Sequence, residues 1–212
     1  MNKTLFFFAL LISAITYSQV QKVFYVEDVK LIDYVTVNFC VNDEAWISEV
    51  TVLPEKTTYQ NKEVIEKLIQ YLKGIQYYSD STLRNNCYDS TFEFVNKKYE
   101  EGKLDEWEYS KCQEFRKGEF RYTDVRYLET RIKRGKKKQR ERGKDFKEKY
   151  RITWTSDYQY ELKYITVNDK KNKHLIGELI KTEIIGITEN GYVYRSKLLN
   201  QKEVIRVIEK MK

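Results

Sequence analysis

Apolar and polar residues alternate along the first half of the chain in a pattern that predicts a small α+β unit. Residues 35–41 are apolar at every second position, which is the spacing of a strand buried on one face. A second β-rich run covers residues 46–53, and residues 64–72 carry apolar side chains at the spacing of an amphipathic helix. A third strand is expected over residues 90–95. One helix on a three-stranded sheet is a compact α+β arrangement.

The second half of the chain contains short β-rich runs separated by turns and predicts an antiparallel β domain. The Asn190-Gly191 pair between two such runs is the strongest hairpin signal in the sequence. The expected strands are residues 119–125, 127–134, 137–142, 150–155, 158–166, 178–188, 192–199 and 203–210. Seven or eight such strands form either a curled meander or a small up-and-down barrel. Residues 204–211 fit a strand or a helix equally well.

The first 18 residues have the pattern of an export signal. Lys3 precedes a largely apolar run of eleven residues, and the small or polar residues Thr16 and Ser18 follow. A membrane-spanning helix needs about 20 apolar residues, so the run favours cleavage after Ser18 over its alternative, an uncleaved anchor. We therefore expect a periplasmic or secreted protein of a Gram-negative envelope, without a transmembrane helix after signal cleavage.

Charge divides the chain at the same place as the periodicity. Residues 19–110 hold 10 Lys/Arg and 17 Asp/Glu, whereas residues 111–212 hold 28 and 15, within an overall net charge of +7. We expect two domains, residues 19–98 and 111–212, joined by the acidic connector 99–110.

Positive charge is most concentrated in residues 131–151, which contain twelve Lys/Arg and three Asp/Glu. In an exported protein such a ribbon meets anionic envelope polymers, and export argues against nucleic acid as the partner. The expected polyanion-binding residues are Arg131, Lys133, Arg134, Lys136, Lys137, Lys138, Arg140 and Arg142. The alternatives are a solvated hairpin that keeps the chain soluble and a patch that pairs with the acidic first domain.

Three segments of the first domain follow the order strand, strand, helix, strand: VTVNFCVNDEAWISEVTVLPE, NKEVIEKLIQYLKGI and YDSTFEFVNK. Together they resemble the C-terminal domain of TonB-type energy transducers over residues 30–97. The resemblance implies that the last strand accepts a partner peptide by strand addition. The partner-binding residues that it implies are Ser90, Thr91, Phe92, Glu93, Phe94 and Val95. The alternative is that residues 23–29 or the second domain cover this edge.

The chain departs from the transducers in three respects. Its turn carries Asp43-Glu44 where theirs usually carries Asp-Gly, and the segment GIQYYSD after the helix lacks their Trp and Pro. The third respect is the lack of a tether. The chain contains a single Pro, so it lacks their proline-rich spacer, and its apolar leader has the pattern of a cleaved signal. The resemblance therefore implies a docking domain for an envelope protein or peptide and not an energy transducer.

The second domain also resembles a known group through the segments CQEFRKGEFRY, ITWTSDYQYEL and NGYVY. The group consists of small secreted bacterial proteins of unknown function, and the resemblance spans residues 112–195. Its members carry a second Cys where this chain has Tyr158. The disulfide that the resemblance implies therefore cannot form here.

Three cysteines make an odd set for an oxidising compartment. A Cys40–Cys87 disulfide would join the first strand to the start of the third, and a Cys87–Cys112 disulfide would join the two domains. We expect the Cys40–Cys87 pairing. Three reduced thiols and a dimer linked through Cys112 are the alternatives.

Local motifs for nucleotide binding, nucleophilic hydrolysis, metalloprotease chemistry and calcium loops do not occur in the sequence. The one histidine, His174, lies in an expected turn among lysines. We therefore expect no catalytic residue, metal or cofactor and a non-enzymatic interaction protein. The alternative is a carrier that holds a small apolar ligand inside a closed C-terminal barrel. A hydrolase would need two close, desolvated carboxylates.

Overall fold

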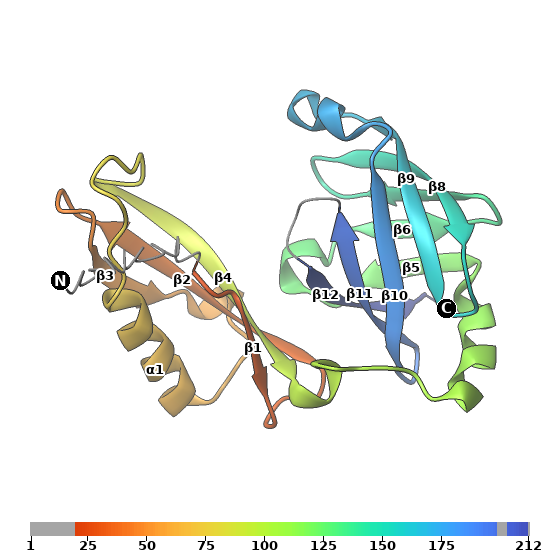
Figure 1. Cartoon of the computed structure of the whole chain (residues 1–212), viewed down its shortest axis with the longest axis horizontal. Helices are drawn as coiled ribbons and strands as arrows, with labels where there is room; N and C mark the ends of the chain where they lie inside the picture. The colour runs from red at the N-terminus through yellow and green to blue at the C-terminus, as the bar shows by residue number, and fades with distance from the viewer. Residues whose placement is uncertain (1–19, 199–202, 212) are drawn as a thin grey trace, which may run out of the picture.

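The computed structural model describes residues 20–198 and 203–211, which form two separate β units (Figure 1). The expected signal peptide, residues 1–18, lies outside the described residues. The first unit is a four-stranded sheet with one α-helix, and the second is a closed barrel of eight strands. This architecture confirms the expected α+β class at the coarse level. No helix within the described ranges is long and apolar enough to span a bilayer.

The sheet of the first unit is mixed, with the strand order β1-β4-β2-β3. Its elements are β1 (Val23–Val26), β2 (Ile32–Val41), β3 (Ile47–Val52), η1 (Pro54–Lys56), α1 (Lys62–Lys73), β4 (Asn86–Asn96) and η2 (Lys97–Tyr99). Strand β4 pairs antiparallel with β2 along its whole length and parallel with β1 at its C-terminal end. It starts four residues before the expected strand, and β1 covers part of its second edge.

Helix α1 lies on one face of this sheet because its apolar stripe is buried there. The side chain of Asn61 caps the helix by accepting a hydrogen bond from the Val64 amide at 3.3 Å. Leu68 and Leu72 are buried and pack with Phe92 and the other apolar residues on this face. Each fully buried Leu contributes roughly 1.5–3 kcal/mol relative to exposure, so these two residues hold α1 on the sheet.

The barrel is an up-and-down meander that closes on itself. Its strands are β5 (Gly118–Tyr122), β6 (Arg131–Arg134), β7 (Lys138–Arg142), β8 (Lys147–Trp154), β9 (Gln159–Val167), β10 (Leu179–Ile187), β11 (Gly191–Leu198) and β12 (Val204–Lys210). Each pairs antiparallel with the next, and β12 pairs with β5, with Ile208 opposite Tyr122. The second domain is therefore a closed barrel and not a curled meander, and residues 204–210 form a strand and not a helix. Short 3-10 turns, η4 (Val125–Tyr127) and η5 (Lys170–Leu175), lie in two connections.

A 3-10 segment, η3 (Glu106–Phe115), closes one end of the barrel. Cys112 and Phe115 are buried in the barrel core, and the Phe115 ring lies 4.8 Å from that of Tyr192 inside the barrel. The sequence assigned the first half of η3 to a free acidic connector. Leu104 of the connector is also buried in this core, and the Tyr109 ring stacks on Tyr158 with ring centroids 4.6 Å apart. The connector prediction missed these contacts because the two residues lie among acidic neighbours.

The two units pack against each other beside β4 and β12. Val95 and Tyr99 from the first unit form one buried cluster with Val193, Ile205 and Val207 of the barrel. A sheet face and a barrel wall are thus joined by apolar contact.

Buried charges lie next to this cluster. The carboxylate of Glu93 accepts hydrogen bonds from Arg206 at 2.7 Å and from Arg126 at 3.0 Å. Arg126 also binds Asp124, whose side chain is fully buried. The two halves therefore do pair acid with base, but through Glu93 and two arginines outside the basic stretch 131–142.

Candidate functional site

Strands β6 and β7 place their side chains alternately outside and inside the barrel, as a pleated strand must. Ile132, Arg134, Gln139 and Glu141 are buried, and the residues between them are exposed cations. Strand β8 continues the pattern. We call the outward cations of these three strands the cationic wall: Arg131, Lys133, Lys138, Arg140, Arg142, Lys147, Lys149 and Arg151.

The register of the strands sets like charges directly opposite one another across the cationic wall. Arg131 faces Arg142, which faces Lys147 on β8. In the next row Arg140 lies between Lys133 and Lys149. Like charges at opposed cross-strand positions destabilise a sheet.

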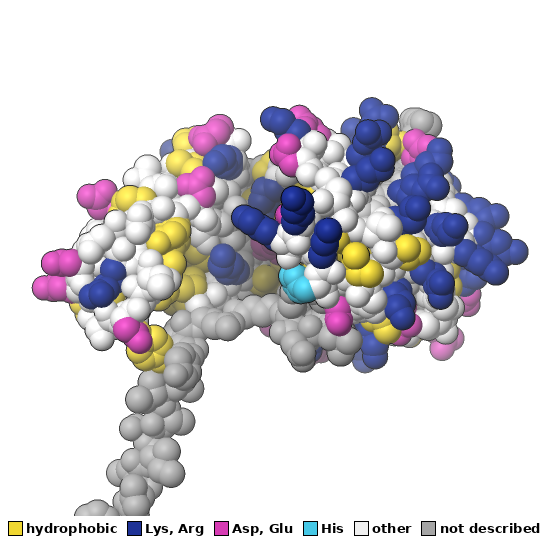
Figure 2. All heavy atoms as spheres, turned by 90° about the horizontal axis from the view of Figure 1, so that it is seen from above, with side chains coloured by type: hydrophobic (Ala, Val, Ile, Leu, Met, Phe, Trp, Pro, Cys, Tyr) yellow, Lys and Arg dark blue, Asp and Glu magenta, His cyan; other side chains and the backbone are white. Residues whose placement is uncertain are grey.

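Few carboxylates relieve this repulsion. Within the described part of the chain, Lys133 is the one member of the cationic wall with an ion pair, to Glu119 at 2.8 Å on the exposed surface. Exposed ion pairs contribute little, so the wall remains strongly positive. Figure 2 shows Lys and Arg side chains crowded over the barrel and fewer over the first unit.

Two hollows run along the cationic wall. One of about 620 Å³ has a lining that includes Arg131, Lys133, Arg140, Arg142, Lys147 and Lys149, together with the carboxylates Glu119, Glu141 and Glu148. The other, of about 800 Å³, brings Lys138 and Arg151 together with Lys136 and Lys137 of the β6–β7 turn. Seven of the eight predicted polyanion-binding residues are therefore exposed on or beside one wall.

Arg134, which we also predicted to bind a polyanion, is the exception because it does not lie on this exposed face. Its side chain lies inside the barrel with 3% of the residue exposed. The guanidinium donates hydrogen bonds to Gln139 at 2.7 Å, to the Phe115 carbonyl at 2.9 Å and to the hydroxyls of Tyr192 and Tyr160. Closure of the barrel turns one face of the ribbon inward, and Arg134 lies on that face.

The barrel also contains a cavity of about 480 Å³ that opens to the surface. Its lining includes six tyrosines (Tyr122, Tyr127, Tyr150, Tyr160, Tyr164 and Tyr194), beside apolar, hydroxyl and charged side chains. Phe146 and Asn172 line it from the loops at the end of the barrel opposite η3. The volume lies in the range of small-molecule sites, about 300–1,000 Å³, but the lining is not the apolar one expected for a carrier of apolar ligands.

Two carboxylates meet in this cavity. Glu141 on β7 and Glu148 on β8 are direct cross-strand partners, and both line the cavity. Glu141 accepts hydrogen bonds from Gln139 at 2.6 Å and from the Tyr122 hydroxyl at 3.0 Å. Glu148 accepts one from the hydroxyl of Tyr150. Burial raises the pKa of Glu141 although both hydrogen bonds oppose it, and the nearby Glu148 charge raises it further.

The sequence missed this cluster because its residues are scattered among surface cations. The alternation of the strands is the signal that could have identified it. Ile132 is apolar and so marks the inner face of β6, and the residues opposite that face on β7 are Gln139 and Glu141. Sequence alone does not fix which register joins the two strands.

The predicted docking strand, Ser90–Val95, lies within β4. Phe92, Phe94 and Val95 are buried, and Glu93 binds the two arginines of the barrel. Strand β1 pairs with β4 from Glu93 to Asn96, so half of the predicted edge is already occupied. Peptide docking remains a prediction for the N-terminal part of the strand.

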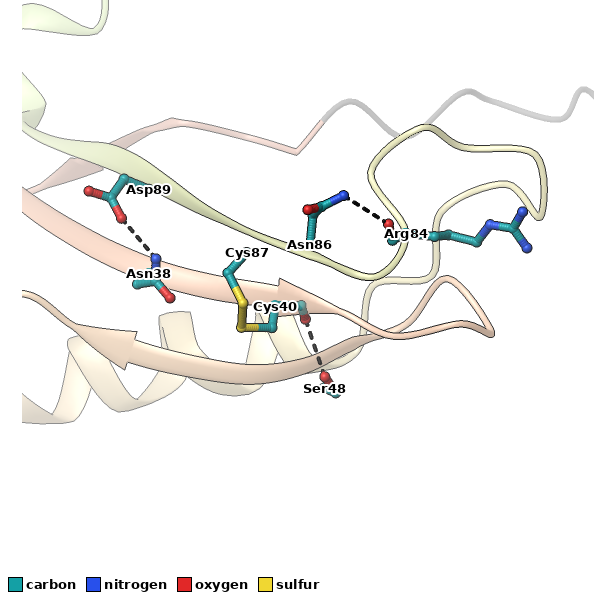
Figure 3. Close-up of a disulfide and its surroundings, with 7 residues drawn as sticks. All are labelled: Asn38, Cys40, Ser48, Arg84, Asn86, Cys87 and Asp89. Atoms are coloured by element: carbon teal, nitrogen blue, oxygen red, sulfur yellow. Dashed lines mark hydrogen bonds between the residues drawn. A yellow bond between two sulfur atoms is a disulfide. The ribbon is translucent and has the colours of Figure 1, made fainter.

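The structure joins Cys40 and Cys87, which is the pairing expected from the sequence, across the directly opposed positions of β2 and β4 (Figure 3). On the same strands Asn38 donates a hydrogen bond to Asp89 at 2.9 Å. Cys112 is a free, buried thiol, and burial raises its pKa to about 11. A protonated, buried thiol is a poor nucleophile.

The one histidine is exposed, and its Nδ1 forms a hydrogen bond with the Lys171 carbonyl at 2.8 Å. No group of three or more His, Cys, Asp or Glu side chains suited to a metal ion lies in the described ranges.

Comparisons with protein-family models, with curated proteins and with solved structures find no match for this chain. The TonB-type resemblance and the resemblance to small secreted proteins therefore stay predictions.

Proposed function

We propose that this protein is an exported, non-enzymatic interaction protein that binds an acidic polysaccharide through the cationic wall of its barrel. The observation that carries the proposal is the stacking of like charges across β6, β7 and β8. This arrangement destabilises the free protein, and a bound polyanion removes the repulsion.

The composition of the wall favours a polysaccharide over a membrane or a single-stranded nucleic acid. The large apolar side chains that are exposed in the described residues lie outside β6, β7 and β8: Trp46, Tyr71, Tyr78, Trp107, Tyr127, Leu128, Ile176 and Val204. Insertion into a bilayer surface uses exposed Trp, Phe or Leu, and single-stranded nucleic acids stack on aromatic rings. Trp154 of β8 lines one hollow of the wall but is half-buried, and the exposed large side chains of these strands are Lys and Arg. Such a surface suits closely spaced carboxylate or sulfate groups, as in heparin-binding patches.

The test measures binding of the mature protein to heparin and to polygalacturonate over a salt series. The test variant is Arg131→Gln/Arg140→Gln/Lys149→Gln, and its matched control, Lys170→Gln/Lys171→Gln/Lys173→Gln, removes three charges from η5 on the same barrel. We expect the wall variant to lose at least about tenfold in affinity and to show a weaker salt dependence, and the η5 variant to bind nearly as the wild type does.

Equal losses in the two variants would overturn the proposal, because net charge alone would then explain binding. Binding to anionic vesicles or duplex DNA but not to either polysaccharide would also overturn it.

A further inference from the structure

The cavity inside the barrel contains a pair of carboxylates without a cation. Glu141 and Glu148 occupy opposed positions on β7 and β8, so their Cβ atoms lie roughly 4.5–5.5 Å apart. Neither carboxylate forms an ion pair with any residue that the structure describes. Glu141 is buried, whereas Glu148 is only half-buried, so the pair is not fully desolvated. Two carboxylates this close still repel each other unless a proton or a cation lies between them.

The arginines nearby are engaged elsewhere. Arg134 directs its hydrogen bonds to Gln139, to the Phe115 carbonyl and to two tyrosines. Arg206 lines the cavity but pairs with Glu93 at 2.7 Å across the interface between the units. Neither arginine forms an ion pair with the two carboxylates, although the positive charge of Arg134 lowers the pKa of Glu141 and so partly offsets its burial.

Tyrosine rings surround the pair. Tyr150, which donates a hydrogen bond to Glu148, packs against Tyr164 with ring centroids 4.7 Å apart, and both line the cavity. Tyr122, which donates to Glu141, lines it from β5. Tyrosine faces attract organic cations, and several such rings beside carboxylates form the kind of cage that binds ammonium groups.

A second, independent feature points to a ligand in this cavity. The hydroxyl of Thr182 on β10 is buried, with 4% of the residue exposed, and finds no hydrogen-bond partner among the described residues. Thr182 lines the cavity beside its strand partner Ser196 of β11, on the wall that lies across the barrel from β6 and β7. A buried hydroxyl without a partner costs free energy, and a ligand with a polar end would satisfy it.

We infer that the barrel cavity binds a small organic ammonium ion, with its cation between Glu141 and Glu148 and its other end toward Thr182. This replaces the apolar ligand of the carrier alternative by a charged one. It does not depend on the cationic wall, which lies on the outer face of the same strands.

Proton binding competes with the ammonium ion in this arrangement. The groups near Glu141 are Tyr122, Gln139, Glu148, Tyr150, Tyr164 and Tyr194, with Arg134 on β6 and Arg206 on β12. Burial raises the pKa of Glu141 above its ordinary value, so without a ligand a proton on Glu141 relieves the repulsion. Binding of an ammonium ion releases that proton. Affinity therefore rises with pH as Glu141 loses its proton and falls as Glu141 gains it.

The test titrates the mature protein with phenethylamine and with phenethyl alcohol, which has a similar shape but no charge, by isothermal calorimetry. We expect one saturable phenethylamine site per chain whose affinity increases as the pH rises above the ordinary pKa of a glutamate, and at least tenfold weaker binding of the alcohol. Glu148→Gln and Glu141→Gln should each raise Kd about tenfold or more. Thr182→Val should raise the Kd of a probe with a polar tail, 3-phenylpropanolamine, severalfold.

Glu161→Gln is the matched control, because Glu161 lies between the cavity residues Tyr160 and Leu162 and so faces outward from β9. It should leave Kd unchanged. Circular dichroism checks that each variant is folded, and the wild-type pH series and the neutral alcohol test the inference even if a variant unfolds.

Three results would overturn the inference: no saturable phenethylamine binding up to about 10 mM, tighter binding of the alcohol, or equal effects of Glu148→Gln and Glu161→Gln. These results can be distinguished from failure of the proposed function. The triple variant of the cationic wall should lose polysaccharide binding but still bind phenethylamine.

Discussion

The two units of this protein build their interiors in different ways. In the first unit, valines, phenylalanines and leucines fill the space between the sheet and α1, and a disulfide joins β2 to β4. In the barrel, the interior contains Arg134, Gln139 and Glu141 in one hydrogen-bonded chain beside tyrosines. An apolar core supplies stability alone, whereas buried polar networks reduce it unless every group is satisfied. The barrel interior is therefore where we place a ligand site.

Removal of the guanidinium from the barrel interior should have the largest effect on stability. Arg134→Met leaves Gln139, the Phe115 carbonyl and two tyrosine hydroxyls without their shared hydrogen-bond donor. We expect the free energy of unfolding to fall by about 3–5 kcal/mol. Urea unfolding followed by fluorescence measures this loss. Arg131→Met, on the exposed face of the same strand, is the control and should change stability little. Similar losses in both variants would mean that the interior network is no more important than the surface.

The second prediction concerns the first unit. Cys40→Ala/Cys87→Ala opens a link between residues 47 positions apart, and we expect a loss of about 2–4 kcal/mol. Hydrogen exchange should show the loss in amides of β2 and β4, while barrel amides keep most of their protection. If barrel amides lost protection to the same extent, the interface through Val95 and Glu93 would bind the two units into one cooperative structure.

The elements of this fold were predictable where the signal is local. Turn residues and alternation predicted most of the barrel strands, for example β11, because a hairpin such as that at Asn190-Gly191 needs only its own residues. Closure of β12 on β5 and the parallel pairing of β1 with β4 join segments more than 60 residues apart. No local pattern encodes these contacts. The sequence therefore leaves open whether the second domain is a closed barrel or a curled meander, and whether the edge of β4 is free or covered.

The candidate sites were predictable only on their outer side. The basic stretch 131–142 is visible as composition, so the cationic wall could be found. Arg134 and Glu141 carry charge like their exposed neighbours, and hydropathy therefore cannot distinguish the inner face from the outer. The structure distinguishes these two buried residues from their exposed neighbours, because burial in a closed barrel depends on strand register and not on residue type.

The smallest expected effect tests whether the outer face of the barrel is strained by its own charge. Arg140 lies between Lys133 and Lys149, so Arg140→Gln should raise the melting temperature by about 1–3 °C at low salt, and added salt should shrink the difference. Arg121→Gln is the control: Arg121 pairs with Glu209 at 3.0 Å, and its loss should lower stability slightly or not at all. Differential scanning calorimetry at two ionic strengths measures both.

A drop in melting temperature for Arg140→Gln would show that the row of cations is neutralised in the free protein, and the main support for polysaccharide binding would be lost. A rise, together with weaker heparin binding by the same variant, would show that the wall lowers the stability of the free barrel and that binding requires it.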